Sequence, residues 1–412
     1  MRNSVLYLYY ICVLLSGCGN QNNQKFRKNY IQLFNENENI GTNKTDMDDS
    51  DMIYYLDFEL NLKSINEDKF TINSIAKNVS FIPLETSDTV LLYSDRIQIE
   101  KINERYLISS SSIFTAFPSI MIFDTTGHFI DYLIQKGQGP QELPYISEWS
   151  CNHATQILVA STFQEIVVHS FENNKKNKYI LEGFFSDACL LNDGTVIGLP
   201  NVSGKGDTET PYLHFLNQEG KIVRSIYYPQ KRKIEYGIPE GKIPGHSEIY
   251  CLYPSYSGDA LFKDMFNDTI YRIRNMDDVK PYIVLYKGSL TPTIKDVNNP
   301  ATGFQKVRLI QILDAKKYFF IRYAYRGEIF SSIWDKQTLT LIANTKLPSQ
   351  LSRFGIFNIV TNYRTLTGKE ILIKILNYFD SKLYCVLDAA QAMEFLPGIE
   401  EDDNPVLMII DI

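Results

Sequence analysis

The chain has 412 residues, of which 44% are hydrophobic, 13% aromatic and 22% charged, with a formal net charge of −7. This charge, and the lack of any long Lys/Arg block, excludes a surface that follows nucleic-acid phosphates and favours a soluble, monomeric body. The 27 Tyr and 24 Phe favour half-buried pleated surfaces, and the length suits a large closed β-architecture.

The N-terminus has the layout of a secretory signal. Met1-Arg2-Asn3 gives a short positive start, and the apolar run 5–15 that follows is too short for a membrane-spanning helix. The stretch 15–18, Leu-Ser-Gly-Cys, resembles the lipobox of bacterial lipoproteins, whose cysteine is acylated and becomes the mature N-terminus. We therefore expect residues 1–18 to be a lipoprotein signal peptide with Cys18 as the lipidated residue. A plain signal peptide with an incidental cysteine is the alternative.

Two regions follow the signal. Residues 19–51 are polar and rich in Asn, with too few apolar groups to offset the cost of ordering, and we expect a flexible tether. From residue 52 to 412, short apolar or alternating runs are separated by turn residues, without a helical period. The predicted strands are 79–83, 106–109, 120–123, 129–134, 157–160, 166–170, 195–199, 212–216, 222–226, 269–273, 282–286, 318–325, 331–334, 339–343 and 406–410.

A repeated hairpin distinguishes a propeller from stacked sandwiches. In 120–133 and 212–226, Asp124 or Asn217 opens a turn and Gly127 or Gly220 follows three residues later, where a positive φ is needed. Recurring hairpins of this kind indicate propeller blades. We predict an all-β fold, a six-bladed β-propeller over 52–412. Because an open ring exposes sheet edges, we expect an early strand to pair with the apolar C-terminal strand 406–412.

Four segments resemble the six-bladed β-propeller lipoproteins of Bacteroides-type bacteria. They are Phe81-Ile-Pro-Leu-Glu-Thr86, the stretch from Phe123 to Glu142 (FDTTGHFI, then KGQGPQE), Asn267-Asp-Thr-Ile-Tyr271 and Asn404-Pro-Val-Leu-Met408. They occur in the family's order and span nearly the whole domain. Gln141 departs from the pattern, which usually has Gly there. The resemblance implies the fold and an exported location, and it supplies no catalytic residues.

The four cysteines beyond Cys18 are widely spaced. Cys151, Cys189, Cys251 and Cys385 allow three disulfide pairings, but their spacing also suits small hydrophobes buried in a core, which we favour.

The strand 318–325 carries the best candidates for ligand contact. Arg322 and Arg326 share one face, where an arginine beside a channel can bind a carboxylate, and Tyr323 and Tyr325 alternate to the other face, where tyrosines can stack. A strand with its tyrosines in the core is the alternative. The long loops 201–211, 229–246 and 289–302 are further places where propellers bind ligands.

Catalytic patterns are weak. The stretch 136–140 lacks the Gly-Lys-Ser/Thr ending of a phosphate loop, and the five histidines have no compact metal spacing, although His128 and His214 lie at the repeated hairpins. No catalytic residue, metal site or cofactor is predicted, apart from possible calcium at Asp402 and Asp403. No Gly-x-Ser-x-Gly element supports a serine hydrolase.

These patterns predict a lipid-anchored module of a bacterial envelope that binds a glycan, a peptide or an envelope protein. The alternative is a propeller-type enzyme, a lyase or hydrolase with a divalent metal in the central channel. Because no acidic cluster follows Cys18, we expect the module to face the periplasm from the outer membrane.

Overall fold

The computed structural model describes residues 52–63, 70–93, 96–112, 115–183, 185–200, 211–227, 251–263, 268–293, 296, 299–348 and 358–412. The predicted signal peptide, Cys18 and the tether lie outside these residues. Ile53–Ser203, Tyr212–Ile226 and Gly237–Ile412 belong to one compact unit, and nearly all of the second unit is outside the described part. None of the helices in the described ranges is long and apolar enough to cross a membrane.

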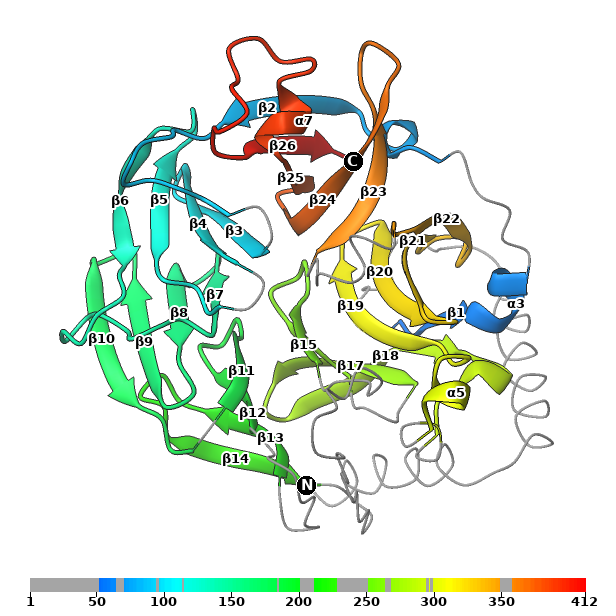
Figure 1. Ribbon diagram of the computed structural model, residues 1–412. Helices are drawn as coiled ribbons and strands as arrows, with labels where there is room; N and C mark the ends of the chain where they lie inside the picture. Colours follow the sequence, from blue (N-terminus) through cyan, green and yellow to red (C-terminus); the bar gives the residue numbers. More distant parts are fainter. Residues whose placement is uncertain are drawn as a thin grey trace, which may run out of the picture. The chain divides into compact units, whose positions relative to one another are not determined.

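Six antiparallel sheets form the blades of a β-propeller, which confirms the predicted fold (Figure 1). Blade 1 contains β3 (Arg96–Ile102), β4 (Arg105–Ser111), β5 (Ile120–Asp124) and β6 (Phe129–Ile134). Blade 2 contains β7 (Glu148–Asn152), β8 (Ile157–Ser161), β9 (Glu165–Ser170) and β10 (Lys175–Ile180). Blade 3 contains β11 (Phe185–Leu190), β12 (Val196–Pro200), β13 (Pro211–Leu216) and β14 (Ile222–Tyr227). Blade 4 contains β15 (Cys251–Pro254), β16 (Ala260–Lys263), β17 (Thr269–Asn275) and β18 (Asp278–Tyr286). Blade 5 contains β19 (Arg308–Asp314), β20 (Tyr318–Tyr325), β21 (Glu328–Asp335) and β22 (Leu341–Lys346). Blade 6 contains β23 (Ile359–Arg364), β24 (Glu370–Phe379), β25 (Lys382–Leu387) and β26 (Val406–Asp411).

The repeated hairpins are built as their sequences predict. Asp124 Oδ1 accepts hydrogen bonds from the backbone N–H groups of Thr126 and His128, at 2.8 and 3.0 Å. Asn217 Oδ1 does the same for Glu219 and Lys221, both at 3.0 Å. The glycines that follow have φ values of 93° at Gly127 and 77° at Gly220. The short polar side chain therefore fixes the turn, and glycine takes the conformation that other residues avoid.

Pairing of the two ends closes the ring. β2 (Asn78–Pro83) pairs antiparallel with β26, from Asn78 opposite Asp411 to Pro83 opposite Val406. β25 pairs with the other edge of β26, so the C-terminal strand is clasped on both sides. The prediction that the C-terminal strand is held by an early strand is confirmed. The apolar side chains of β26 are buried, so closure is also hydrophobic.

A strap of short elements precedes the closing strand. β1 (Tyr54–Asp57) adds in parallel to β18 of blade 4, and α3 (Phe58–Lys63) follows it directly. Phe58 packs against Tyr323 and Trp334 of blade 5, at ring distances of 5.2 and 5.0 Å. The 3-10 helix η2 (Ile72–Ser74) then leads to β2 in blade 6. The strap thus touches three successive blades, an arrangement that the sequence does not predict.

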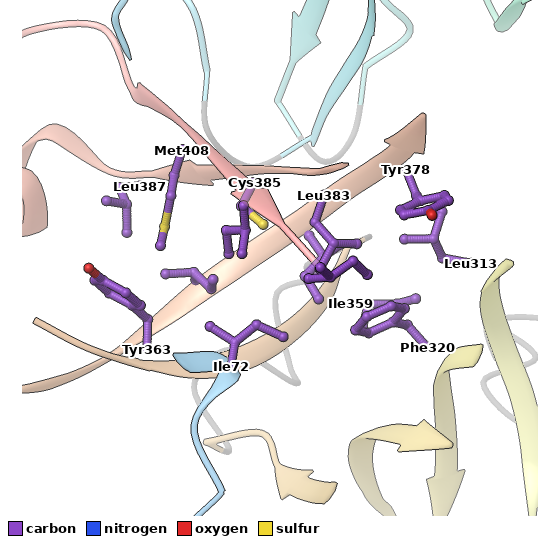
Figure 2. Close-up of a cluster of buried hydrophobic side chains, with 14 of the residues drawn as sticks. Ile72, Leu313, Phe320, Ile359, Tyr363, Tyr378, Leu383, Cys385, Leu387 and Met408 are labelled. Carbon is purple, nitrogen blue, oxygen red and sulfur yellow. The ribbon is translucent and has the colours of Figure 1, made fainter. Parts of the chain in front are cut away.

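The largest apolar cluster joins blades 5 and 6 (Figure 2). Phe320 and Leu313 of blade 5 pack with Ile359, Leu383 and other buried side chains of blade 6. Ile72 of the strap belongs to the same cluster and is fully buried. The final blade is therefore held by packing against its neighbour as well as by strand pairing.

Three of the four family-like segments meet at the closure. Asn404 Oδ1 accepts a hydrogen bond from Leu92 N at 2.7 Å, and its Nδ2 donates to the carbonyl oxygens of Glu85 and Val90. Glu85 Oε2 in turn accepts a hydrogen bond from Phe129 N at 2.9 Å, and Glu85 N donates to Gly127 O. Buried backbone groups need such partners, so these segments have a structural role at the junction of blades 1 and 6.

The second half of the segment 123–142 and the remaining segment 267–271 are also structural. In the stretch 136–142, the Glu142 carboxylate folds back over Gly137 and accepts a hydrogen bond from Gly139 N at 2.9 Å. In the segment 267–271, residue 267 lies outside the described residues. Asp268 accepts a hydrogen bond from Thr291 Oγ1 at 2.7 Å and forms an ion pair with Lys287. Glu142 therefore fixes its own turn, and Asp268 ties the start of β17 to the segment after β18.

The contact at Gly127 gives a matched test of the closure. A Cβ at Gly127 would lie 2.1 Å from the carbonyl oxygen of Pro83 in β2, whereas a Cβ at Gly368 (φ 83°) meets nothing within 4 Å. Gly127→Ala should lower the free energy of unfolding by at least about 3 kcal/mol, since it adds a clash to the backbone strain. Gly368→Ala should cost only the strain, about 1–2 kcal/mol. Urea denaturation of both variants measures the difference, and equal losses would contradict the close approach.

Candidate functional site

A cavity of about 220 Å³ lies where five of the six blades converge. Its wall comes from β3, from the ends of β7, β11 and β15 with their following turns, and from the end of β24. The lining residues are Glu100, Ser150, Cys151, Asn152, His153, Ala154, Cys189, Leu190, Asn192, Pro254, Ser255, Tyr256, Ser257, Gly258, Asp259, Asn377, Tyr378 and Phe379. More than half of these residues have polar side chains, but the surface that they expose to the cavity is more apolar than polar.

Glu100 links three blades at one side of the cavity. Its side chain is only 8% exposed, its Oε2 lies 3.1 Å from His153 Nε2, and its Oε1 accepts a hydrogen bond from Asn377 Nδ2 at 2.8 Å. The hydrogen bond to Glu100 raises the pKa of His153 above its ordinary value, although burial acts in the opposite direction. His153 also lies against the ring of Phe379, at 5.5 Å. The group is an acid–base pair held by blades 1, 2 and 6.

A chain of amides crosses the opposite side. Asn152 Nδ2 donates to Asn192 Oδ1 at 2.8 Å, and Asn192 Nδ2 donates to the carbonyl oxygen of Ser257 at 2.8 Å. Ser257 Oγ donates to Asp259 Oδ2 at 2.8 Å. These bonds join the turns of blades 2, 3 and 4 and fix the orientation of groups that can bind a polar ligand.

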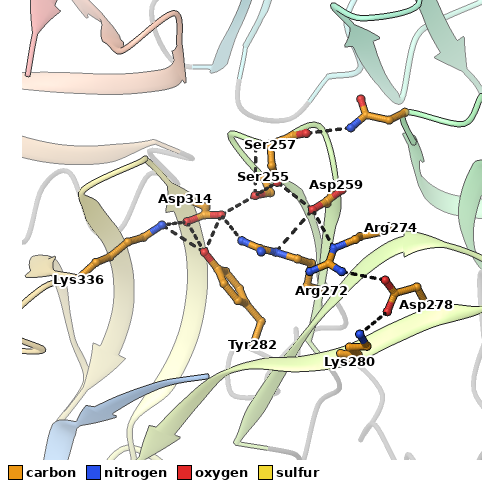
Figure 3. Close-up of polar contacts among 11 residues, drawn as sticks. Ser255, Ser257, Asp259, Arg272, Arg274, Asp278, Lys280, Tyr282, Asp314 and Lys336 are labelled. Carbon is orange, nitrogen blue, oxygen red and sulfur yellow. Dashed lines mark hydrogen bonds and ion pairs between the residues drawn. The ribbon is translucent and has the colours of Figure 1, made fainter. Parts of the chain in front are cut away.

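A buried ionic network supports this wall from behind (Figure 3). Asp314 of blade 5 is 1% exposed, and it accepts hydrogen bonds from Lys336 Nζ and Ser255 Oγ, both at 2.5 Å. Tyr282 donates to the same carboxylate, and burial raises the pKa of its hydroxyl, so it stays protonated. Breaking such a pair leaves a buried charge, at a cost of about 3–5 kcal/mol. We assign this network to positioning Ser255 at the cavity.

Arginines extend the network toward Asp259. The Arg272 guanidinium stacks over Tyr282, 3.6 Å from the ring centre, and its Nε lies 3.6 Å from Asp259 Oδ2. Burial raises the pKa of Asp259, while Ser257 and the two arginines Arg272 and Arg274 act to lower it. The cavity therefore has an acidic wall whose positive partners lie behind it. None of the described residues that line the cavity is Lys or Arg.

Two thiols also face the cavity. Cys151 and Cys189 are free, as is the buried Cys385, while the side chain of Cys251 lies outside the described ones. Burial raises the pKa of the Cys151 thiol and raises that of Cys189 to about 12, so both stay protonated and unreactive as nucleophiles. They are small, weakly polar wall groups.

The four candidate residues, three on β20 and Arg326 in the turn after it, do not form one group. Arg322 is 3% exposed, and Tyr323 is 1% exposed on the opposite face, where its hydroxyl donates to Asn344 Oδ1 at 2.9 Å. Tyr325 is half-buried, and Arg326 is exposed in the following turn with φ 53°. Because Tyr323 packs on Phe58 of the strap, it has a structural role, and none of the four lines the cavity.

Other sequence candidates have local roles. His128 Nδ1 lies 2.9 Å from Thr126 Oγ1 in an exposed turn, and His214 Nδ1 lies 2.8 Å from Ser225 Oγ. Asp403 Oδ2 accepts a hydrogen bond from Glu400 N in the turn before β26. No group of three or more His, Cys, Asp or Glu suited to a metal is found in the described part of the chain. The loops 201–210 and 229–246 lie outside it.

Sequence reasoning missed the cavity residues. Glu100, Asn152, His153 and Asn377 lie far apart in the chain, and no local motif joins them. The one available signal is that each stands at or near the end of a strand beside a turn, which is where propellers place their ligand contacts.

The strands, the closure and the polar centre define a six-bladed β-propeller with a convergent cavity. The chain belongs to the family described as domain of unknown function (DUF4934), whose model matches residues 57–411. No curated protein matches the chain significantly.

One solved structure shares the fold, and two others are less similar. A protein of Bacteroides fragilis described as exported is 16% identical, with a TM-score of 0.62, over 88% of this chain and 99% of that one. A member of the DUF4221 family from Bacteroides vulgatus is 12% identical, with a TM-score of 0.48, over 82% and 96%. Virginiamycin B lyase from Staphylococcus aureus is 11% identical, with a TM-score of 0.41, over 81% and 99%.

The Glu100–His153 pair predicts a pH effect. A raised pKa means that His153 stabilises the fold below about pH 6.5, and that this contribution is lost as the pH rises through its folded pKa. In an NMR titration, the imidazole signal that disappears in His153→Gln should therefore titrate above 6.5. His169, whose pKa burial lowers to about 4, provides the contrast. Titration of His153 at or below 6.5 would contradict the pairing.

Proposed function

We propose that this protein is a ligand-binding module of a bacterial envelope, and that the cavity receives one sugar unit of a glycan. The observation that carries the proposal is the convergence of strand ends from five blades on one cavity, where polar side chains and aromatic rings lie side by side. Fixed amides, hydroxyls and aromatic rings are the groups that recognise a polyhydroxylated ligand by hydrogen bonds and stacking.

The size and charge of the cavity limit the class of ligand that it can bind. Its 220 Å³ is below the 300–1,000 Å³ of pockets for drug-sized ligands, so the ligand is small or enters by one end. Glu100 and Asp259 supply negative charge at the wall, and a carboxylate or phosphate would meet repulsion there. A neutral or amino sugar suits the cavity better than an anionic one.

An enzyme is the second candidate, and the Glu100–His153 hydrogen bond at the cavity edge favours it. A histidine with a raised pKa beside a carboxylate can exchange protons with a bound substrate near neutral pH. The metal-dependent form of this candidate has no support in the described residues, which offer no suitable group of ligands. Turnover of a bound glycan by wild type but not by His153→Gln would favour the enzyme.

The binding site is tested with the purified full chain by calorimetry against glucose, galactose, N-acetylglucosamine and glucosamine. Asn192→Leu removes the amide that bridges Asn152 and Ser257, and should weaken binding of the best sugar at least tenfold, about 1.4 kcal/mol. Asn173→Leu, in the exposed turn between β9 and β10, is the matched control and should bind as wild type. Absence of binding by all four sugars, or equal affinity of the two variants, would contradict the proposal.

The location belongs to the same proposal: Cys18 carries the lipid, and the propeller faces the periplasm from the outer membrane. The lipobox-like stretch before Cys18 supports this anchoring. In cells given a labelled fatty acid, the wild-type chain should take up label and fractionate with the outer membrane. Cys18→Ala should do neither. A Cys18→Ala chain that still carries label in the membrane fraction would disprove lipidation at this residue.

A further inference from the structure

Arg322 is an arginine buried between two blades. It lies on the face of β20 that also bears Phe320, and Phe320 packs into the cluster shared with blade 6. Ser331, the cross-strand partner of Arg322 on β21, accepts a hydrogen bond from Val360 N of β23 at 3.1 Å. The guanidinium therefore lies on the side of blade 5 that meets blade 6.

A second arginine shares this face. Arg308 of β19 pairs with Ala324, two residues from Arg322, and Gln311 pairs with Arg322 itself. Diagonal neighbours of this kind have Cα atoms ~7–8 Å apart. Arg308 is 8% exposed and Arg322 is 3% exposed, so the strand register places two buried arginines on this face.

Buried polar atoms without partners occur in Arg322, in its cross-strand neighbour Gln311 and in Asn358, two residues before Val360. Among the described residues, the Nε of Arg322, the Oε1 of Gln311 and the Nδ2 of Asn358 are buried without a hydrogen bond. Burial lowers the pKa of Arg322 to about 10, an effect opposed by Tyr253 and by no carboxylate. A buried charge without a counter-ion costs several kcal/mol, and protein structures avoid such an arrangement unless a ligand completes it.

We propose that Arg322, together with Arg308, Gln311 and Asn358, forms a site for an oxyanion between blades 5 and 6. A planar guanidinium binds a carboxylate or phosphate through paired N–H groups, and the Asn358 amide adds a donor. The Gln311 carbonyl accepts from a hydroxyl next to the anionic group. The carboxylate of an acidic sugar has both groups, and inorganic phosphate has the same oxyanion chemistry.

The site is separate from the cavity. Neither arginine lines the cavity, and Gln311 stands three residues before Asp314 along β19, a distance of ~10 Å. The two sites also differ in charge, since the cavity wall is acidic and this site is basic. Failure of one proposal therefore leaves the other open to its own experiment.

The test follows thermal unfolding of the full chain with galacturonate, inorganic phosphate or neutral galactose, at equal ionic strength. Galacturonate should raise the wild-type Tm, and phosphate should do so if the oxyanion alone suffices. Galactose lacks the oxyanion, so any shift that it causes by binding in the cavity should be the same in Arg322→Met as in wild type. Arg322→Met should lose the galacturonate shift. Its own Tm without ligand should equal or exceed that of wild type, because an unpaired buried charge has been removed.

Two further variants keep the test decisive. Arg322→Lys retains the charge without the planar fork and should bind galacturonate at least tenfold more weakly, even if the Met variant fails to fold. Arg326→Gln, in the exposed turn four residues later, removes the same charge and should keep the full shift. The proposal is overturned if neither anion shifts the wild-type Tm, or if Arg322→Lys or Arg322→Met responds as wild type does.

Discussion

Closure of the ring by β2 and β26 is the constraint on which the rest of the structure depends. β26 has partners along both edges, and the turn before it is fixed by the Asn404 side chain, which bonds to the loop after β2. Glu85 and Gly127 extend the same junction into blade 1. The three family-like segments at this junction therefore reflect the closure of the ring, and they do not indicate what the protein binds.

The cavity exists only in the closed ring. Asn377 and Phe379 come from blade 6, and they reach Glu100 and His153 of blades 1 and 2 because closure brings the last blade beside the first. Behind the opposite wall, Asp314 links blade 5 to Ser255 of blade 4. The hydrogen bonds that join the blades also orient the side chains that line the cavity, so the geometry of the cavity and the stability of the ring depend on the same contacts.

The sequence predicts the outer parts of the blades better than their centre. All fifteen predicted strands are strands in the structure, yet β3, β7, β11, β15, β19 and β23, which begin the six blades, were not predicted, nor were β1, β10, β16, β24 and β25. β7 (EWSCN) and β11 (FSDACL) mix polar and apolar residues, so they lack the alternation by which a strand is recognised. Most of the cavity residues lie on or beside the strands that begin the blades, and Asn377, Tyr378 and Phe379 lie on β24. Arg322 was named as a candidate from its residue type alone, and its burial depends on blade 6. Tyr323 is covered by Phe58 from a distant part of the chain.

The order of the strap along the chain bears on mechanical load. Any pull that arrives from the N-terminal side meets β1 and α3 first, because both precede β2. Two contacts must break before force reaches the closing strand. They are the parallel pairing of Tyr54–Asp57 with Ile283–Tyr286 and the packing of Phe58 in blade 5. In a propeller held at this end, these contacts break first under load and can re-form afterwards, while the ring behind them stays closed.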